Sequence, residues 1–291
     1  MDKHFKNIHF ISWNVRGLGD VDKCKLVCDN LTSALPTIIC LQESNLDNVD
    51  RFKAATFLPT AFTTLYSLDA DGTRGGILTA WGPSIFTLSS FTTRRHTLTT
   101  TLHSTTTDLA ITITNVYAPS DHRDSQIFLD GLIELAPHIT GPWILAGDFN
   151  LVRDAADKNN DAINLGLADA FNSTINQLQL MELSLLDCLV HLRSSPTLAR
   201  LYHVFLNLDI NSLCPNNTLT SITRTTSDHI PLLVTISTAI PKPSIFRFDV
   251  AWFQHNDFLP AVLPAWYSTQ SPGRSSGHLV GSLKSARHAA K

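Results

Sequence analysis

The chain of 291 residues has little that is typical of a membrane protein or of a disulfide-stabilised secreted protein. No apolar run reaches the ~18 residues that a transmembrane helix needs. The N-terminal sequence MDKHFKNIHF contains no apolar stretch typical of a signal peptide. The five cysteines are an odd number without paired spacing, which argues against a disulfide scaffold. We therefore expect a soluble intracellular protein without a membrane partner.

The chain also carries little charge. Only 16% of its residues are charged and the formal net charge is -3, unlike the strongly basic profile of many nucleic-acid-binding proteins. A polyanionic partner would therefore require local Arg and Lys side chains, together with a metal ion, to offset its phosphates. Hydrophobic residues make up 43% of the chain, which is enough to bury the core of one large domain or two small ones.

Hydrophobic periodicity and turn residues predict two groups of short strands, each accompanied by helices. Strands are expected within 84–116, which should hold three, and over 7–13, 37–41, 62–67, 76–81, 142–146 and 230–236. Helices are expected over 21–35, 125–139 and 166–178. Their inward residues should include Val27, Leu31, Leu35, Phe128, Leu129, Leu132 and Leu135. This pattern is typical of two packed sheets covered by helices.

Two segments have an unusual composition. Residues 84–116 are rich in threonine, and we expect these threonines on the exposed faces of antiparallel strands. After Ile240 the chain reads PKPSIFRFDVAWF, with two prolines followed by aromatic residues, and 268–291 are rich in Ser, Gly and basic residues. We therefore place a domain boundary near residue 240.

Five short polar motifs each lie at the end of an apolar run or just before one. They are WNVRG with Asn14, LQES with Glu43, NVYAPS with Tyr117, GDFN with Asp148 and Asn150, and SDH with Asp228 and His229. If neighbouring strand ends bring these side chains together, the result is an acidic, oxygen-rich pocket. Such a pocket suits a hard divalent cation and a phosphate ester.

Each motif has an ordinary structural explanation when taken alone. Glu43 fits a solvated charge at a strand end, and Asp148 fits an Asx turn. A tyrosine such as Tyr117 is often a core aromatic with a satisfied hydroxyl. A lone histidine such as His229 is usually structural or solvated. The recurrence of all five motifs in order favours a functional site over these separate explanations.

The set WNVRG, LQES, NVYAPS, GDFN and SDH resembles the endonuclease/exonuclease/phosphatase superfamily, which has the fold of DNase I and the apurinic endonucleases. WNVRGLG, GGILTAW, WILAGDFN and SPTLAR (195–200) resemble more closely the endonuclease domain of plant LINE-type non-LTR retrotransposons. The resemblance covers residues 8–240 and continues weakly through FRFDVAWFQHNDFLPAVLPAWY. In such elements this last stretch leads to a reverse transcriptase, which these residues do not include.

The resemblance implies an α+β fold, a four-layer α/β/β/α sandwich of two mainly antiparallel sheets with helices outside. Residues 1–240 would form the enzyme domain, and 241–291 would be a linker or tail. The implied activity is that of a Mg²⁺-dependent phosphodiesterase that nicks one strand of DNA, with Mn²⁺ as the alternative ion. A nuclear location is implied in the same way.

The resemblance also implies a role for each motif residue. Glu43 would be the principal metal ligand, with Asn14 and Asp228 beside it. Asp148 would orient and deprotonate the attacking water, and Asn150 would help to hold that water and the phosphate. Tyr117 and His229 would contact the scissile phosphate and stabilise the charge of the transition state.

The chain departs from the family pattern at two places. Tyr202 stands where relatives carry an Asp that pairs with the histidine of SDH, and the segment 187–195 lacks their usual Trp. If Tyr202 occupies that position, it should lie near the His229 ring, and the native chain should be slower than Tyr202→Asp. A catalytically silent copy that keeps the fold is therefore one alternative. A phosphatase acting on a phospholipid or inositol phosphate is another, which the LINE-like strings disfavour.

Overall fold

The computed structural model describes residues 7–72, 74–158, 163–186, 200–222, 229–238 and 257–267, together with 282, 285 and 286. The chain divides into two compact units, Met1–Ile240 and Pro241–Lys291. The first unit holds two six-stranded sheets. In the second, the helix α6 (Phe258–Tyr267) is described. No helix among the described residues is long and apolar enough to cross a membrane.

The first sheet has the strand order β11-β12-β1-β2-β4-β3. These strands are β1 (Ile8–Asn14), β2 (Ile38–Gln42), β3 (Thr64–Asp71), β4 (Arg74–Trp81), β11 (Asn216–Ser221) and β12 (Leu232–Ser237). β1 and β2 pair in parallel, whereas the other neighbours are antiparallel. The helices that precede and follow β2 are α1 (Val21–Ala34) and α2 (Arg51–Ala54).

The second sheet has the order β5-β6-β7-β8-β10-β9. Its strands are β5 (Phe86–Arg94), β6 (Thr97–Ser104), β7 (Ala110–Tyr117), β8 (Trp143–Asp148), β9 (Met181–Glu182) and β10 (Tyr202–Leu206). Here β7 and β8 form the parallel pair. The accompanying helices are α3 (Ser125–Leu135), α4 (Leu165–Gln177) and α5 (Leu208–Leu213), with 3-10 turns η1 (His122–Asp124), η2 (Ala136–His138) and η3 (Ala155–Asp157).

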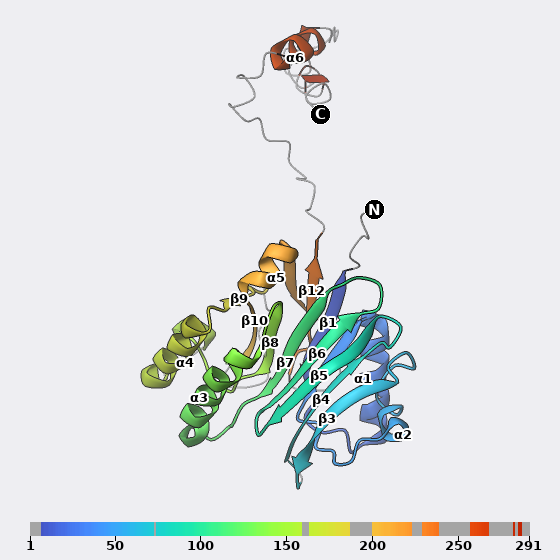
Figure 1. Ribbon diagram of the computed structural model, residues 1–291, viewed down its shortest axis with the longest axis vertical. Helices are drawn as coiled ribbons and strands as arrows, with labels where there is room; N and C mark the ends of the chain where they lie inside the picture. Colours follow the sequence, from blue (N-terminus) through green and yellow to red (C-terminus); the bar gives the residue numbers. More distant parts are fainter. Residues whose placement is uncertain are drawn as a thin grey trace. The chain divides into compact units, whose positions relative to one another are not determined.

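Three apolar clusters separate the layers of the first unit. One joins the inner faces of the two sheets, including Phe10, Ile38 and Ile144. The second packs α1 and α2 against the first sheet, and the third packs α3 and α4 against the second sheet. Figure 1 shows the two pairs of helices on opposite sides of the sheets. The predicted four-layer α/β/β/α sandwich is therefore confirmed.

The inward residues predicted for 125–139 are confirmed, because all four are buried in α3. In the first helix, Val27 and Leu31 are buried, but the prediction for Leu35 is wrong. The helix ends at Ala34, and Leu35 caps it with φ 49°, which turns a side chain that is 76% exposed away from the core. No pattern predicted α5 and β11, which are short and only partly apolar.

The prediction that the threonines of 84–116 are exposed is wrong for β6 and β7. Thr99 and Thr114 are buried, and their hydroxyl oxygens lie 2.9 Å apart in a hydrogen bond. The indole Nε1 of Trp143 donates to Thr114 Oγ1 at 3.0 Å. Because these hydroxyls bond to each other and to Trp143, their burial costs little. Only the edge strand β5 is exposed as predicted.

Candidate active site

The topology brings the ends of four strands to one edge of the paired sheets. Asn14 and Gln42 are the last residues of the parallel pair β1 and β2, whereas Tyr117 and Asp148 end the parallel pair β7 and β8. The carboxyl ends of parallel neighbours lie at the same edge. The antiparallel strand β10 begins at this edge, where Tyr202 pairs with Asp148.

Asn14 connects the two sheets at this edge. Its Nδ2 donates to Glu43 Oε2 at 2.9 Å and to Asp148 Oδ2 at 3.0 Å. Its Oδ1 accepts the backbone N–H of Arg16 at 3.0 Å, which fixes the orientation of the amide. Asn14 and Asp148 are 1% and 2% exposed, and Glu43 is half-buried. One amide group therefore holds two carboxylates from different sheets in one pocket.

Burial raises the pKa of the Asp148 carboxyl above its ordinary value. The hydrogen bond from Asn14 and the charge of His229 oppose this shift without cancelling it. A carboxylate with a raised pKa accepts a proton more readily than an exposed one. Asp148 is therefore suited to act as a base.

The backbone around these acids adopts conformations that few residues tolerate. Glu43 and Asn150 have φ angles of 53° and 48°, in the left-handed region. Gly147 has φ 148°, and a Cβ there would lie 2.0 Å from the carbonyl oxygen of Val116. Asn150 is held by its Nδ2, which donates to Ala118 O at 2.8 Å, and by its N–H, which donates to Asp148 Oδ1 at 3.1 Å.

Tyr117 contacts the same pocket through its hydroxyl, which shares a hydrogen bond with Glu43. Burial, followed by the negative charges of Glu43 and Asp148, raises the pKa of Tyr117 to about 12. Its hydroxyl therefore stays protonated near neutral pH and can donate a hydrogen bond to an anionic group.

His229 lies at the same edge, just before β12. Its backbone carbonyl accepts Trp13 Nε1 at 3.1 Å. Its ring Nδ1 hydrogen-bonds with the hydroxyl of Tyr202, which also donates to Asp148 Oδ2 at 3.0 Å. The prediction that Tyr202 lies near the His229 ring is confirmed, with ring centroids 5.1 Å apart.

The chemistry of this pocket fits a divalent cation. No Lys or Arg of the described residues forms a salt bridge with Glu43 or Asp148. Two carboxylates that share one amide and lack such partners repel each other, and a cation offsets that repulsion. Within the described ranges no three His, Cys, Asp or Glu side chains are grouped to hold a metal ion. The predicted ligand Asp228, like the altered segment 187–195, lies outside the described residues.

Comparison with known proteins identifies the family. Residues 11–270 match the model of the endonuclease/exonuclease/phosphatase family. The chain belongs to this family. Its members are hydrolases that act on nucleic acids or other phosphate esters. No curated protein sequence matches the chain.

Solved structures of low sequence identity share the fold of this endonuclease/exonuclease/phosphatase chain. An AP endonuclease from Leishmania major has a TM-score of 0.62 at 15% identity, over 80% of this chain and 88% of that chain. The endonuclease domain of TRAS1, a telomere-specific non-LTR retrotransposon, has a TM-score of 0.60 at 14% identity, over 80% and 99%. An AP endonuclease from Archaeoglobus fulgidus has a TM-score of 0.59 at 14% identity, over 79% and 99%.

A pair of buried amides behind the site was missed in the sequence. Gln42 Nε2 donates to Asn115 Oδ1 at 2.6 Å, and Asn115 Nδ2 donates to Leu78 O at 2.9 Å. Both amide side chains are 0% exposed. They join β2 to β7 across the two sheets, one residue before Glu43 and two residues before Tyr117. The only sequence signals were a polar residue at the end of the apolar strand β2 and another near the end of β7.

A cluster of charges around Glu182 was also missed. Its carboxylate accepts from Arg153 Nη1 at 2.6 Å and from Arg200 Nη2 at 2.5 Å, and its Oε1 lies 2.8 Å from Nδ1 of the buried His203. The Nε2 of His203 lies 3.1 Å from Leu151 O. The cluster therefore ties β9 and β10 to the loop that follows the GDFN motif.

Replacing Glu182 with Gln is expected to lower the unfolding free energy by on the order of 3 kcal/mol near neutral pH. Burial alone would raise the pKa of Glu182, but the hydrogen bond and charge of His203, with Arg153 and Arg200, lower it from 4.5 to about 2. A depressed carboxyl pKa stabilises the fold above pH 4.5, and this contribution is lost as the pH falls towards about 2. Urea unfolding of both proteins over this range measures it.

The matched control for this prediction is Glu134→Gln. Glu134 pairs with Arg94 at 3.0 Å, but its side chain is 71% exposed, so its loss should cost at most about 1 kcal/mol. A stability difference between native and Glu182→Gln that does not shrink between pH 4.5 and about 2 would contradict the assignment of this charge cluster.

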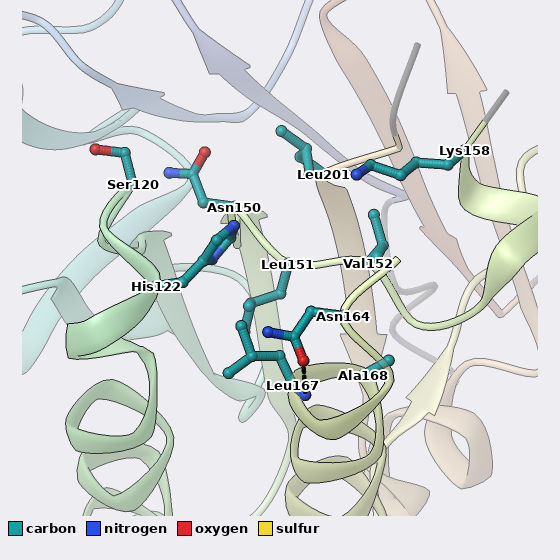
Figure 2. Close-up of a pocket in the computed structure, with 10 residues that line it drawn as sticks. All are labelled: Ser120, His122, Asn150, Leu151, Val152, Lys158, Asn164, Leu167, Ala168 and Leu201. Carbon is teal, nitrogen blue, oxygen red and sulfur yellow. Dashed lines mark hydrogen bonds between the residues drawn. The ribbon is translucent and has the colours of Figure 1, made fainter. Parts of the chain in front are cut away.

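A pocket of about 410 Å³ adjoins Asn150. Figure 2 shows Ser120 and His122 on one side of it and Lys158 on the other. Its remaining lining is largely apolar and comes from the loop after β8, from the N-cap and first turn of α4 and from the residue before β10, namely Leu151, Val152, Asn164, Leu167, Ala168 and Leu201. The acidic site thus continues into a space whose lining includes the cationic Lys158.

Proposed function

We propose that the chain is a metal-dependent phosphodiesterase that nicks one strand of DNA, as in target-site cleavage by LINE-type retrotransposons. The observation that carries the proposal is the contact of Asn14 with both Glu43 and Asp148. It holds a candidate metal ligand and a candidate base in one pocket, with hydroxyl and imidazole donors beside them. The LINE-like strings WNVRGLG, GGILTAW and WILAGDFN favour this activity within the family.

Mg²⁺, or Mn²⁺ in its place, would be held by Glu43, Asn14 and Asp228. When bound, the cation polarises the P–O bonds and offsets the charge of the transition state. The carboxylate of Glu43 supplies the negative charge that attracts it, and the contact with Asn14 keeps that carboxylate in place.

The side chains of this chain divide the remaining work. Asp148 orients a water and accepts its proton as the water oxygen bonds to phosphorus and the bond to the leaving sugar oxygen breaks. Asn150, fixed by its contact with Ala118, helps to position the water and the phosphate. Tyr117 donates its hydroxyl proton in a hydrogen bond to the phosphate, and His229 contacts the same group. Such fixed donors stabilise the charge that develops in the transition state.

The pocket beside Asn150 supports a substrate larger than a phosphate group. Lys158 supplies a local cationic group in a chain with a net charge of -3, and His122 adds an imidazole that can hydrogen-bond to a phosphate. Apolar side chains such as Leu167 and Leu201 offer a surface for the parts of a nucleotide next to the scissile bond. We accordingly propose DNA as the partner, and 241–291 as the stretch that leads to a reverse transcriptase in LINE elements.

Conversion of supercoiled plasmid to the open-circular form tests the proposal. We expect nicking with Mg²⁺ or Mn²⁺ and none with EDTA. Release of phosphate from an inositol phosphate without nicking would support the phosphatase alternative. A folded chain that nicks in neither its native form nor as Tyr202→Asp would support the silent copy.

Tyr202→Asp is expected to nick faster than the native chain, by up to roughly 10–100-fold. The Tyr202 hydroxyl contacts His229 but carries no charge, whereas a carboxylate would favour the charged imidazole as well as orient it. Initial nicking rates of both proteins measure the gain. A folded Tyr202→Asp protein no faster than the native chain would refute the idea that this one residue limits catalysis.

A further inference from the structure

The hydroxyl of Tyr202 touches two groups that the proposed reaction uses. Tyr202 is the first residue of β10 and pairs with Asp148, the last residue of β8. Its hydroxyl donates to Asp148 Oδ2 at 3.0 Å and hydrogen-bonds with Nδ1 of His229. The two rings meet edge to face, with an interplanar angle of 66°. A single side chain therefore links the buried carboxylate with the imidazole.

With Asp148 ionised, the donors and acceptors of this link fit together in one way. A phenol has one hydrogen to donate, and an ionised carboxylate only accepts. The hydrogen of Tyr202 therefore points at Asp148, and the hydroxyl oxygen accepts a hydrogen from His229. Nδ1 of His229 must then carry a hydrogen.

The backbone of His229 is anchored separately. Its carbonyl accepts the buried indole N–H of Trp13 at 3.1 Å, which holds the start of β12 against β1. This bond does not fix the rotation of the imidazole about its side-chain bonds. The hydrogen bond between Nδ1 and the Tyr202 hydroxyl constrains that rotation.

We propose that Tyr202 is a positioning residue that orients the imidazole of His229 and couples it to Asp148. The assignment rests on the proposed phosphodiesterase function. The Tyr202 phenol reaches both partners from the position where relatives carry a carboxylate. The phenol has no charge, but its hydrogen bond to Asp148 connects the imidazole to a carboxylate. Tyr202→Phe keeps the ring contact but loses both hydrogen bonds.

The first test is structural and does not depend on activity. In the full-length protein, the Nδ1–H of His229 should give a protected proton signal by nuclear magnetic resonance, identified by its loss in His229→Ala. We expect Tyr202→Phe to lose this signal through exchange with solvent. The control Tyr66→Phe removes the hydroxyl of a tyrosine on β3 whose ring contacts Phe91, and it should keep the signal.

The second test is kinetic. Tyr202→Phe should lower kcat for nicking by roughly 10–100-fold with KM nearly unchanged, as expected for a lost orienting partner. In a His229→Ala background the same change should have no further effect, because the partner through which Tyr202 acts is gone.

Three outcomes separate a failure of the positioning role of Tyr202 from a failure of the proposed nuclease function. A protected His229 signal that survives in Tyr202→Phe overturns the positioning role, whatever the activity. Equal losses of kcat with and without His229 also overturn it, because Tyr202 would then act through another group. A signal that disappears in Tyr202→Phe while the native protein fails to nick supports the link and refutes the nuclease function instead.

Discussion

Asp148→Asn is expected to lower the nicking rate by about 10²–10⁴-fold, the range for loss of a general base. The change keeps the size of the side chain and removes its charge. Asp148 is 2% exposed, and burial raises its pKa, so its carboxylate is prepared to take a proton from water. An amide cannot take that proton. Initial rates of open-circle formation, at saturating Mg²⁺, measure the effect.

The control for Asp148→Asn is Asp169→Asn, on the exposed surface of α4. This control should nick at the native rate, which excludes a general effect of lost negative charge on DNA binding. Equal unfolding temperatures would show that the Asp148 variant is folded. A folded Asp148→Asn protein that keeps more than about a tenth of the native rate would remove Asp148 from the role of base.

Much of the site could be predicted because polar residues end apolar strands. Asn14, Tyr117 and Asp148 are each the last residue of a central strand, and two parallel pairs carry them to one edge. The apolar runs predicted where the strands lie. The resemblance to the family predicted which strand ends carry the residues of the site. The contact of Tyr202 with His229 followed from the same resemblance and is confirmed.

Other features depend on contacts that a local pattern does not contain. Thr114 alternates along its strand as an exposed residue would, and only the neighbouring Trp143 and Thr99 show that its face is covered. Gln42 and Asn115 are 73 residues apart and become partners only when the sheets pack. The bond from Tyr202 to Asp148 requires the register of β10 against β8, which spans 54 residues of sequence.

Glu43→Gln is expected to raise the Mg²⁺ concentration for half-maximal nicking by at least roughly 100-fold, since loss of an outer partner alone costs 10–100-fold. Glu43 is the predicted principal ligand, and its left-handed backbone, with φ 53°, presents the carboxylate beside Asn14. Gln keeps the length of the side chain but removes the charge that attracts a hard cation. Nicking rates over a Mg²⁺ titration measure the shift.

Thermal unfolding provides a readout of the same site without DNA. A cation that binds only the folded state of a protein raises the protein's unfolding temperature. Mg²⁺ should therefore stabilise the native protein and have little effect on Glu43→Gln. Without metal, the variant should be the more stable of the two, because Glu43 and Asp148 share the amide of Asn14 and repel each other. The control Glu134→Gln removes an exposed carboxylate and should respond to Mg²⁺ as the native protein does. If Mg²⁺ stabilises Glu43→Gln as strongly as the native chain, the cation binds elsewhere and Glu43 is not its ligand.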